Sequence, residues 1–396
     1  MSLLATQVNE FLEKSSWIRK MFEAGRELKK QHGEDRVFDF SLGNPDLPPP
    51  AVVGQALHRI ADQADRPYAF GYMPNAGFPR VREKLAHHLS REQGTGVGAE
   101  DILLTCGAAG GLNCLFRTIL EPGEEVVCPS PYFVEYGFYL SNHQGVFKTV
   151  PTTADFHLDI EAIDNALTER TRMVLINSPN NPTGQVYGRE EIEALGRLLL
   201  ARSSGRKRPI FLVSDEPYRF LTYDGAAVHS ILPAYPYSAV VSSFSKNLAM
   251  AGERIGYVLL NPSMENKDIL MDGLVYVNRI LGYVNAPTIG QQVLEDALGF
   301  EVDVSRFERR RELMQQVLQD AGYRFTSPRG GFYFFPQAPG GDDVEFVRRL
   351  QDELVLAVPG SGFGAPGYFR LSFCVPEEVI ERSASGFAKA KEGLPA

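Results

Sequence analysis

The sequence predicts an α/β fold: a large domain with a mostly parallel sheet between helices, plus a smaller α+β domain. Short apolar runs typical of buried strands alternate with helical patterns between residues 101 and 260. Most of these runs end in polar residues, and doubly wound sheets carry their sites at the carboxyl ends of their strands. Beyond residue 260 the pattern becomes mostly helical and includes short strand-like segments, which indicates the second domain.

The first hundred residues contain two helical patterns, one short strand and a connector. Residues 8–31 and, more clearly, residues 79–92 carry apolar side chains at helical spacing. Residues 38–42 predict a short strand. Residues 43–50 must be extended and irregular, because their prolines exclude both a helix and a strand ladder. We interpret this segment as a connector between two structural units.

The later elements follow from the same patterns. Apolar runs predict the strands of the large sheet at residues 101–106, 125–128, 173–177, 210–214 and 239–241. Helices are expected to begin at residues 107–112 and to span residues 190–200 and 307–320. In the tail, strand-like segments occupy residues 331–335, 355–358 and 368–373.

The stretch of residues 239–256 carries the chemistry that organises the site. A strand ends in serines, Lys246 follows at once, and Arg254 lies eight residues further on. Lysine forms Schiff bases with aldehydes once its pKa is lowered. Hydroxyls and a guanidinium bind a phosphate monoester. Ser243, Ser245, Lys246 and Arg254 together therefore point to pyridoxal phosphate, which carries both an aldehyde and a phosphate.

Other interpretations of these residues stay open at this point. Lys246 alone also fits an ordinary surface lysine that follows a strand. The spacing Ser243-x-x-Lys246 matches the S-x-x-K of penicillin-recognising serine enzymes, but their S-D-N and K-T-G motifs are missing, because Ser214-Asp-Glu and Lys148-Thr-Val do not match. Residues 107–112, small side chains between a strand and a helix, form either a phosphate cradle or tight packing.

Composition and charge argue against several other classes of protein. Hydrophobic residues make up 44% and charged residues 22%, which is ordinary for a globular protein, and the net charge of −9 argues against a dedicated nucleic-acid binder. The four cysteines show no metal-ligand spacing, so we expect no metal and a reducing cytoplasm. We find no signal-peptide pattern and no membrane-spanning apolar stretch. Residues 360–365 fit the loose dinucleotide pattern G-x-G-x-x-A, but a proline and a strand follow where that motif requires a helix.

A series of short motifs runs through most of the chain, from residue 38 to residue 373. They are Ser41-Leu-Gly-Asn-Pro-Asp, Tyr72 with Gly77-Phe-Pro, Gly107-Ala-Ala, Ser178-Pro-Asn-Asn-Pro-Thr-Gly, Asp215-Glu-Pro-Tyr, Ser243-Phe-Ser-Lys, Arg254-Ile-Gly and Phe369-Arg-Leu-Ser-Phe. In this order they resemble the aspartate aminotransferase family, the fold-type-I pyridoxal-phosphate enzymes of class I and II. The resemblance implies a large cofactor-binding domain of residues 48–290 and a small domain formed by residues 1–47 and 291–396.

The resemblance also implies catalytic roles. Lys246 would hold pyridoxal 5'-phosphate as an internal aldimine and, once the amino-acid substrate frees it, act as the base in a proton shift. Asp215 would pair with the pyridine nitrogen and keep it protonated. Asn181 and Tyr218 would donate hydrogen bonds to the phenolic oxygen of the cofactor, with help from Asn177.

The remaining contacts of cofactor and substrate are implied in the same way. The residues expected around the phosphate are Gly107, Ala108, Ala109, Ser243, Ser245 and Arg254. Phe133, in preference to Tyr132, would stack on the cofactor ring. Arg370 would clamp the substrate carboxylate, with help from the Gly43 amide and Asn181.

The resemblance further implies a homodimer. Tyr72 matches a residue that reaches the phosphate bound in the neighbouring subunit, so the two subunits would share their active sites. Relatives in the family also have cis peptide bonds before prolines that match Pro131 and Pro182.

Two positions bear on the substrate. Bacterial aspartate-specific relatives often carry a lysine where this chain has Ala109, and other aspartate enzymes carry an arginine that we align with Ile280, next to Arg279. A distal carboxylate buried without a cation is strongly disfavoured, and Ala109 leaves room for a larger side chain. We therefore expect a neutral or aromatic L-amino acid as donor and a 2-oxo acid such as 2-oxoglutarate as acceptor.

Other activities are possible on the same scaffold. A C–S lyase, which performs a β-elimination, or a cyclopropane-forming synthase would use the same cofactor residues. A non-catalytic regulator would need a DNA-binding extension, and the roughly forty residues before the first motif lack a basic recognition helix. We predict an aminotransferase whose partners are its substrates and a second copy of the chain, without nucleic acid or membrane.

Overall fold

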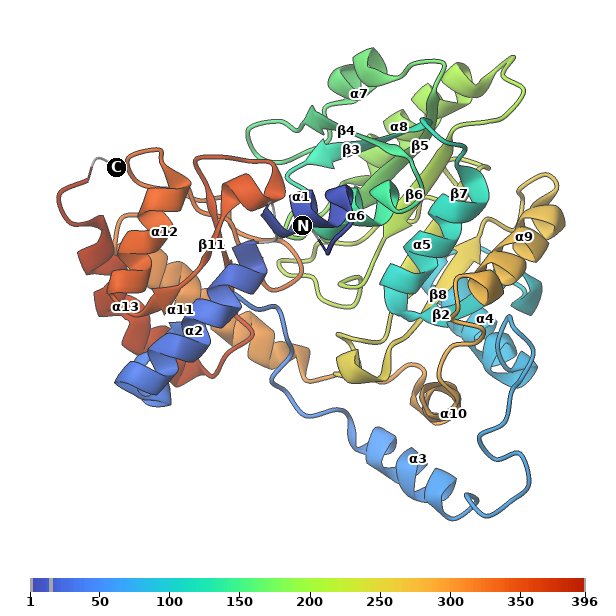
Figure 1. Ribbon diagram of the computed structural model, residues 1–396, viewed down its shortest axis with the longest axis horizontal. Coiled ribbons are helices and arrows are strands. Elements are labelled where there is room, and N and C mark those ends of the chain that lie inside the picture. Colours follow the sequence, from blue (N-terminus) through green and yellow to red (C-terminus); the bar gives the residue numbers. More distant parts are fainter. Residues whose placement is uncertain (1–2, 14–16, 395–396) are drawn as a thin grey trace.

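A seven-stranded sheet forms the centre of the larger part of the molecule (Figure 1). In this computed structural model, which describes residues 3–13 and 17–394, the strand order is β2-β8-β7-β6-β5-β3-β4. The strands are β2 Ile102–Cys106, β3 Glu125–Ser130, β4 Val146–Pro151, β5 Thr171–Asn177, β6 Phe211–Asp215, β7 Ser238–Ser243 and β8 Ile255–Leu260. Strand β8 runs antiparallel to both of its neighbours, and every other pairing in this sheet is parallel. The predicted mostly parallel sheet is therefore confirmed.

Helices cover both faces of this sheet. On one side lie α3 Ala51–Ala61, α4 Pro79–Gln93, α7 Ile160–Ala166, α8 Arg189–Ser203 and α10 Thr288–Ala297, and on the other side α5 Gly107–Ile119, α6 Glu135–Ser141 and α9 Lys267–Ile280. Along β7, Val240 packs with the first group of helices, whereas Ala239 and Val241 pack with the second. Because successive side chains point to opposite faces and both faces are covered, the central strands read as unbroken apolar runs in the sequence.

The edge strand β4 has no counterpart among the predicted strands. It has a neighbour on one side only, so Val146 is 43% exposed and Lys148 is half-buried. An edge strand with one open side needs no continuous apolar run. The signal that revealed the central strands is therefore missing here.

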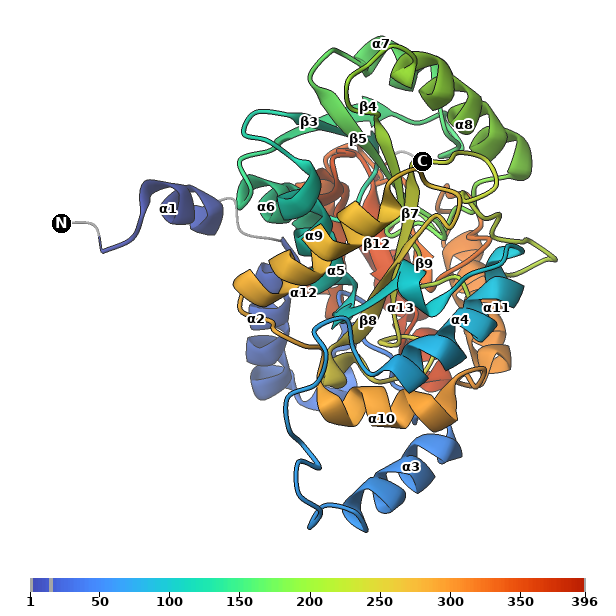
Figure 2. The same ribbon diagram turned by 90° about the vertical axis from the view of Figure 1, so that its right-hand side faces the viewer.

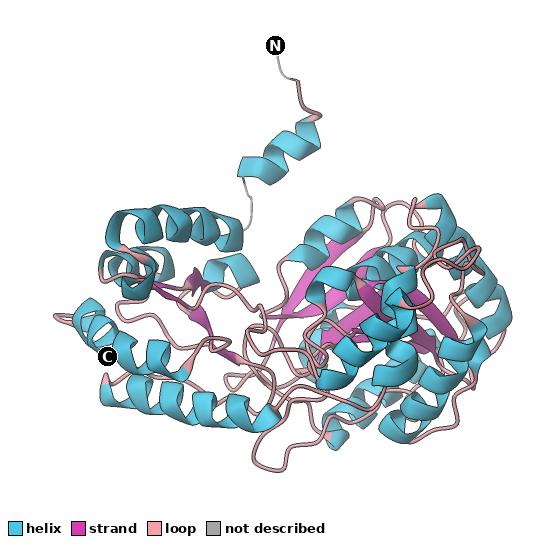
Figure 3. Cartoon of the chain, turned by 90° about the horizontal axis from the view of Figure 1, so that it is seen from below, coloured by secondary structure: helices cyan, strands magenta, loops and turns pink. Residues whose placement is uncertain are grey.

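The smaller part of the molecule combines helices with two small sheets. Its helices are α2 Trp17–His32, α11 Val304–Asp320, α12 Asp343–Asp352 and α13 Glu377–Lys391. One sheet is antiparallel, in the order β11 Val358–Pro359, β12 Phe369–Ser372 and β9 Tyr333–Phe334, and the other pairs β1 Phe38–Asp39 in parallel with β10 Val355–Leu356. Phe40 shares a separate apolar core with Phe307 and Phe369. The segment around residue 38 therefore folds together with the C-terminal part, and Figure 3 shows the two groups of strands apart from each other.

The N-terminal helical pattern is divided between two helices. α1 Thr6–Glu13 extends away from the body of the molecule in Figure 2. It touches α6 through the rings of Phe11 and Phe138, whose centres are 5.0 Å apart, and through a 2.6 Å hydrogen bond from the Gln7 amide to the Ser141 hydroxyl. Of the helix expected over residues 8–31, residues 14–16 lie outside the described residues. Short 3-10 turns occur at Glu34–Arg36, Ala99–Asp101, Ala251–Glu253 and Gly360–Phe363.

The proline-rich connector is extended, as predicted, and leads into α3. Within it, Asp46 accepts hydrogen bonds of 2.6 and 2.8 Å from both terminal nitrogens of the buried Arg310 on α11. Further along, Arg59 of α3 pairs with Asp296 of α10 at 2.8 Å. The connector is thus tied to the small domain before the chain reaches α3, which packs on α10.

The described residues contain two cis peptide bonds, Ser130–Pro131 and Ser178–Pro179. The first matches the expectation, but the second was expected before Pro182, and that prediction is wrong. Residues 180–184 form a helical-type turn that is closed by a 2.9 Å hydrogen bond from the Gly184 amide to the Asn180 carbonyl. Turns of this kind are built from trans peptide bonds.

No helix in the described part of the chain is both long enough and apolar enough to cross a membrane. In the same part, no group of three or more His, Cys, Asp or Glu side chains could hold a metal ion. All four cysteines are free thiols, and only Cys106 is partly exposed.

Candidate active site

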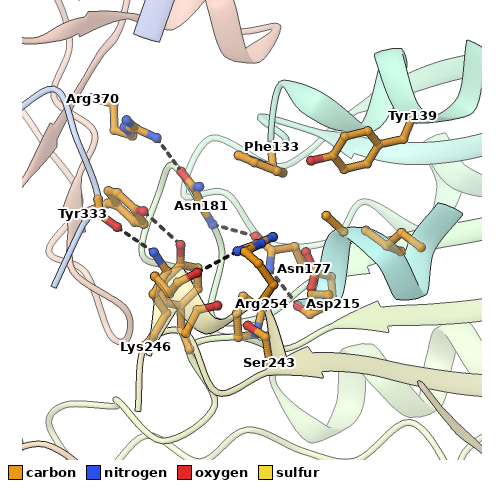
Figure 4. A pocket seen from close by; sticks show the side chains of 18 residues that line it. Phe133, Tyr139, Asn177, Asn181, Asp215, Ser243, Lys246, Arg254, Tyr333 and Arg370 are labelled. Atoms are coloured by element: carbon orange, nitrogen blue, oxygen red, sulfur yellow. Dashed lines mark hydrogen bonds between the residues drawn. The ribbon is translucent and has the colours of Figure 1, made fainter. Parts of the chain in front are cut away.

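A cavity of about 300 Å³ opens at the carboxyl ends of the central strands (Figure 4). Strands β5, β6 and β7 end there with Asn177, Asp215 and Ser243, and the small domain contributes Tyr333 and Arg370. The cavity is lined by Gly43, Ala108, Ala109, Leu112, Phe133, Tyr139, Asn177, Asn181, Asp215, Pro217, Tyr218, Ser243, Ser245, Lys246, Ala251, Arg254, Tyr333 and Arg370. The fold therefore brings together residues that are far apart in the sequence.

Lys246 contributes an amine with a lowered pKa. Its Nζ donates a 2.6 Å hydrogen bond to the Gly43 carbonyl and lies 5.6 Å from the centre of the Phe332 ring. Burial lowers the pKa of Lys246 to about 8, and the positive charges of Arg370 and Arg254 act in the same direction. A large fraction of the amine is therefore neutral near pH 8, which is the form that acts as a nucleophile or a base.

Asp215 is a buried carboxyl group with one free oxygen. Its Oδ2 accepts a 2.6 Å hydrogen bond from the Tyr136 hydroxyl, whereas its buried Oδ1 has no hydrogen-bond partner among the described residues. Burial raises the pKa of Asp215 to about 7, the bond from Tyr136 lowers it and Glu216 raises it further. A cationic N–H group in the cavity would satisfy the free oxygen and favour the charged carboxylate.

Two asparagines shape the turn that follows β5. The Asn177 side chain donates to the Asp215 carbonyl at 2.7 Å and accepts from the Asn181 amide, also at 2.7 Å. The Asn181 oxygen accepts from Arg370 at 3.0 Å. The NH₂ group of Asn181 is therefore the part of that side chain left to donate to a bound molecule.

An anion cradle forms where α5 begins. Gly107 has a φ of +70°, and a Cβ at this position would lie 3.1 Å from an Nη of Arg254. The other terminal nitrogen of Arg254 donates to the Ala251 carbonyl at 2.9 Å, which holds the guanidinium beside the helix N-terminus. Ser243 and Ser245 line the same cavity. Free amides, hydroxyls and a guanidinium together suit a phosphate group.

Arg370 is a buried cation without an acidic partner. It is 2% exposed, it forms no ion pair with an acidic side chain of the described residues, and burial lowers its pKa. Its terminal nitrogens donate to the Ser41 carbonyl at 2.6 Å and to Asn181 at 3.0 Å, as Figure 4 shows for Asn181. A buried guanidinium of this kind favours a carboxylate that arrives with the substrate.

The opposite wall of the cavity is aromatic. In Figure 4, Phe133 lies above the cavity, and Lys246 and Ser243 lie below it. The ring of Phe133 meets that of Tyr136 edge to face, with ring centres 5.4 Å apart. A planar ring could therefore lie between Phe133 and the end of β7.

Two of the predicted site residues do not line the cavity. Gly107 lies next to Arg254, and its lack of a side chain permits their close approach. Tyr72 is 93% exposed on the loop between α3 and α4. Within a single chain, therefore, Tyr72 does not reach the cavity.

Several residues of the site were not predicted. Leu112, Tyr139, Pro217, Ala251 and Tyr333 line the cavity, and Tyr136 binds Asp215. Aromatic residues at 133, 136 and 139 recur at helical spacing after a strand, which is a signal that could have identified α6 as part of the site. Tyr333 has no such signal, because it lies in an aromatic run that reads simply as a strand.

Comparison with protein families and known sequences gives consistent results. The family model "Aminotransferase class I and II" matches residues 35–387. The aspartate/prephenate aminotransferase of Thermus thermophilus is 34% identical over 372 residues, which cover 92% of each chain. A probable aspartate aminotransferase of Methanocaldococcus jannaschii is 30% identical over 353 residues, covering 87% of this chain and 91% of that protein.

Solved structures show the same similarity in three dimensions. An amino transferase from Eubacterium rectale superimposes with a TM-score of 0.94 at 34% identity and covers 100% of both chains. The aspartate aminotransferase of Thermus thermophilus with maleate gives a TM-score of 0.87 at 32% identity, covering 98% of this chain and 100% of that one.

Proposed function

Because the chain belongs to the class I and II aminotransferase family, we propose that it transfers the amino group of a neutral or aromatic L-amino acid to a 2-oxo acid such as 2-oxoglutarate. The proposal depends on one observation above all. The Lys246 amine, the Asp215 carboxyl group and the Arg370 guanidinium line a single cavity, although they come from distant parts of the sequence.

We propose pyridoxal phosphate as the cofactor, held with its ring nitrogen toward Asp215 and its phosphate in the cradle of Ser243, Ser245 and Arg254. The free Oδ1 of Asp215 supports this orientation, because a buried acceptor without a partner is otherwise costly. The lack of a side chain at Gly107 also supports it, because it leaves space beside the Arg254 guanidinium for the phosphate. When bound, the cofactor supplies an aldehyde for the amino group and a ring that withdraws electrons.

Each polar residue of the cavity has a separate role in the proposed reaction. Lys246 Nζ, whose pKa is near 8, exchanges the proton at the α-carbon of the substrate. Asp215, shielded from water, favours a protonated ring nitrogen. Tyr218 and Asn181 donate hydrogen bonds beside Lys246, and Arg370 binds the α-carboxylate of the substrate.

The charges of the cavity support a substrate with a neutral side chain. Lys246, Arg254 and Arg370 are the cations among the described lining residues, and each already has a proposed task. Ala109 and Tyr139 offer an apolar surface instead. A second carboxylate would find no further cation among the described residues that line the cavity, although the relatives named above are called aspartate or aspartate/prephenate aminotransferases.

We further propose a homodimer with shared active sites. Tyr68 and Tyr72 are each 93% exposed, and Tyr276 and Ile280 of α9 are 58% and 49% exposed. The loop with both tyrosines is tied to the end of α9, since the Asn75 side chain donates to the Val284 carbonyl at 2.8 Å. Large exposed apolar groups on neighbouring elements favour an interface, and Tyr72 would reach the partner's phosphate site.

We also propose that the protein works in the cytoplasm. All four cysteines are free, and Cys114, Cys128 and Cys374 are buried in the core. Free thiols suit a reducing compartment.

Lys246→Ala tests the proposed function. The variant should lose turnover by a factor of at least about 10⁴, because the amine acts both as covalent anchor and as base. It should also lose the visible absorbance that the bound cofactor gives to the wild type. Lys207→Ala, which removes an exposed lysine, is the control and should retain both signals.

Amino donors are screened in the same assay with 2-oxoglutarate as acceptor. Neutral or aromatic amino acids should react with a higher kcat/KM than aspartate. An active Lys246→Ala variant would contradict the proposal. So would a wild type that releases pyruvate and thiol from cystathionine but transfers no amino group.

A further inference from the structure

Tyr333 touches several of the residues to which the proposed function assigns a task. It lies on β9 of the small domain and is 2% exposed. Its hydroxyl is 2.9 Å from the Tyr218 hydroxyl, and its ring centre lies 4.8 Å from the guanidinium carbon of Arg370. It also lies so close to Gly43, whose carbonyl binds Lys246, that a Cβ on Gly43 would collide with its hydroxyl.

We propose that Tyr333 is a positioning residue that holds Tyr218 and Arg370 in a fixed relation to each other. This inference rests on the proposed function, because it needs Tyr218 beside the cofactor and Arg370 at the substrate carboxylate. Tyr333 comes from the small domain, whereas Tyr218 follows β6 of the large sheet. Inside the cavity, the hydrogen bond between their hydroxyls links the two domains in addition to the one from Arg370 to Asn181.

Either hydroxyl could be the donor in the hydrogen bond between Tyr333 and Tyr218. Burial raises the pKa of Tyr333 to about 12, and Arg370 counteracts this rise. Burial raises the pKa of Tyr218 well above 10, and Tyr333 raises it further. We assign the donor role to Tyr333, which lies next to the cationic Arg370, so that the Tyr218 oxygen accepts. The Tyr218 proton is then free for a hydrogen bond into the cavity, which the bond from Tyr333 strengthens.

The second contact fixes the orientation of Arg370. Its guanidinium carbon lies 4.7 Å from the centre of the Phe363 ring and 4.8 Å from the centre of the Tyr333 ring. Phe363 belongs to the glycine-rich stretch of residues 360–365, which fits a dinucleotide motif only loosely. The Ser130 hydroxyl donates to the Gly364 carbonyl at 2.8 Å and so anchors this stretch on the large domain. Contact with two aromatic rings restricts the orientation of the guanidinium and leaves its N–H groups to bind a carboxylate.

Tyr333→Phe tests the hydroxyl separately from the ring. In the full-length, cofactor-loaded enzyme, kcat should fall about fivefold, the worth of one hydrogen bond, while KM for the amino acid changes less than about twofold. The pH midpoint of the visible absorbance change should rise by roughly half a unit, because Tyr218 becomes a weaker donor. Besides Tyr218, the titratable or charged groups that influence Tyr333 are Arg370 and Cys374.

Tyr333→Leu removes the ring as well and should raise KM for the amino acid about tenfold, because Arg370 loses one supporting face. The control is Tyr323→Phe, which deletes a buried hydroxyl of the same domain that donates to the Phe387 carbonyl at 2.9 Å. This variant should lose only thermal stability. A double variant of Tyr333→Phe with Tyr218→Phe should be no slower than Tyr218→Phe alone, since Tyr333 acts through Tyr218.

Two failures are distinguishable. If the wild type transfers amino groups but Tyr333→Phe keeps its kcat and its absorbance midpoint, the positioning role is wrong and the proposed function stands. If Tyr333→Phe proves too unstable to assay, a Tyr218→Phe variant with an unchanged midpoint overturns the positioning role equally. If the wild type transfers no amino group and gives no visible absorbance with pyridoxal phosphate, the proposed function itself fails.

Discussion

At the scale of single residues, Asp215 shows how the site stores unfavourable energy that a ligand can relieve. Burial raises the pKa of this carboxyl group to about 7, and its Oδ1 lacks a hydrogen-bond partner among the described residues. The hydrogen bond from the Tyr136 hydroxyl offsets part of the free-energy cost of burying this carboxyl group. A positively charged partner in the cavity would relieve the rest, so cofactor binding and folding stability should be linked through this one residue.

Asp215→Asn should therefore stabilise the cofactor-free protein at high pH. The pKa of Asp215 is about 7 in the folded protein against an ordinary value of 3.8. The folded state thus holds more protons between these pH values, and wild-type stability falls as the pH rises through this window. The neutral asparagine does not undergo this loss of stability, which amounts to roughly 4 kcal/mol at pH 8 and roughly 1.5 kcal/mol at pH 5. Thermal unfolding at the two pH values measures the difference.

A matched control has the opposite sign. The hydrogen bond from Arg202 lowers the pKa of Asp164, so Asp164→Asn should be less stable than the wild type by a similar amount at pH 8 and at pH 5, both of which lie above the ordinary carboxyl range. Equal shifts for Asp215→Asn at both pH values would show that its charge is not the cause. Activity of Asp215→Asn should be lost at either pH, since asparagine cannot stabilise a protonated ring nitrogen.

At the scale of elements, the start of α5 and the turn after β7 together form the proposed phosphate cradle. The backbones of Gly107 and Gly256 pack closely against each other, and a Cβ on Gly256 would lie 2.6 Å from the Gly107 carbonyl carbon. Their missing side chains let the helix N-terminus approach Arg254. Strand β8 runs antiparallel to β7 and begins directly after Arg254, beside the end of β7. The sheet topology itself therefore places Arg254 near Ser243.

Gly107→Ala should weaken cofactor binding by roughly tenfold or more, the loss expected when one charge-assisted hydrogen bond is disturbed. The reason is twofold, since the φ of +70° is unfavourable for alanine and the new Cβ would lie 3.1 Å from Arg254. Gly94→Ala is the control, because Gly94 also has a positive φ, of +65°, but no neighbouring atom within 4 Å of the added Cβ. Titration of cofactor-free protein with pyridoxal phosphate compares them. Equal affinities would refute a role for Gly107 in the cradle.

At the scale of the whole molecule, the single chain leaves the Tyr72 side chain exposed and outside its own cavity. Tyr72 is almost fully exposed, and so is Tyr68 on the same loop. The loop is nevertheless anchored, since the Asn285 side chain donates to the carbonyls of Met73 and Pro74 at 3.1 Å each. An anchored loop that presents aromatic side chains is suited to insertion into a second copy.

Mixed dimers test whether the sites are shared. Lys246→Ala chains and Tyr72→Ala chains should each give dimers with little activity at low cofactor concentration. A dimer with one chain of each kind would regain one complete site, with Lys246 from one chain and Tyr72 from the other. Mixing should therefore restore up to about half of the wild-type activity per dimer. Tyr68→Ala, equally exposed, is the control for Tyr72→Ala, and no gain on mixing would argue against shared sites.

Sequence patterns predicted most of the strands that are buried on both faces of the large sheet, but not the fully buried strand β8. The central strands and α4 were visible because each element shows a regular apolar period. The edge strand β4 was missed, since one open side removes that period, and the cis bond at Pro179 was misplaced, since local turn geometry is not encoded in spacing. Tyr136 and Tyr333 were also missed as site residues, because their roles depend on contacts with Asp215 and Tyr218 made across the fold.

The sequence by itself predicted the chemistry that we propose for this protein: a lysine after a serine-rich strand, an acid at the end of another strand and an arginine near the C-terminus point to pyridoxal phosphate and to amino-group transfer. Only the tertiary structure decided which groups support them. Direct neighbours in the chain reveal residue types and periods, whereas the pKa of Lys246 and the placement of Arg370 arise from burial among residues hundreds of positions away, such as Gly43 and Ser41. Desolvation and long-range hydrogen bonds exist only once the chain has folded.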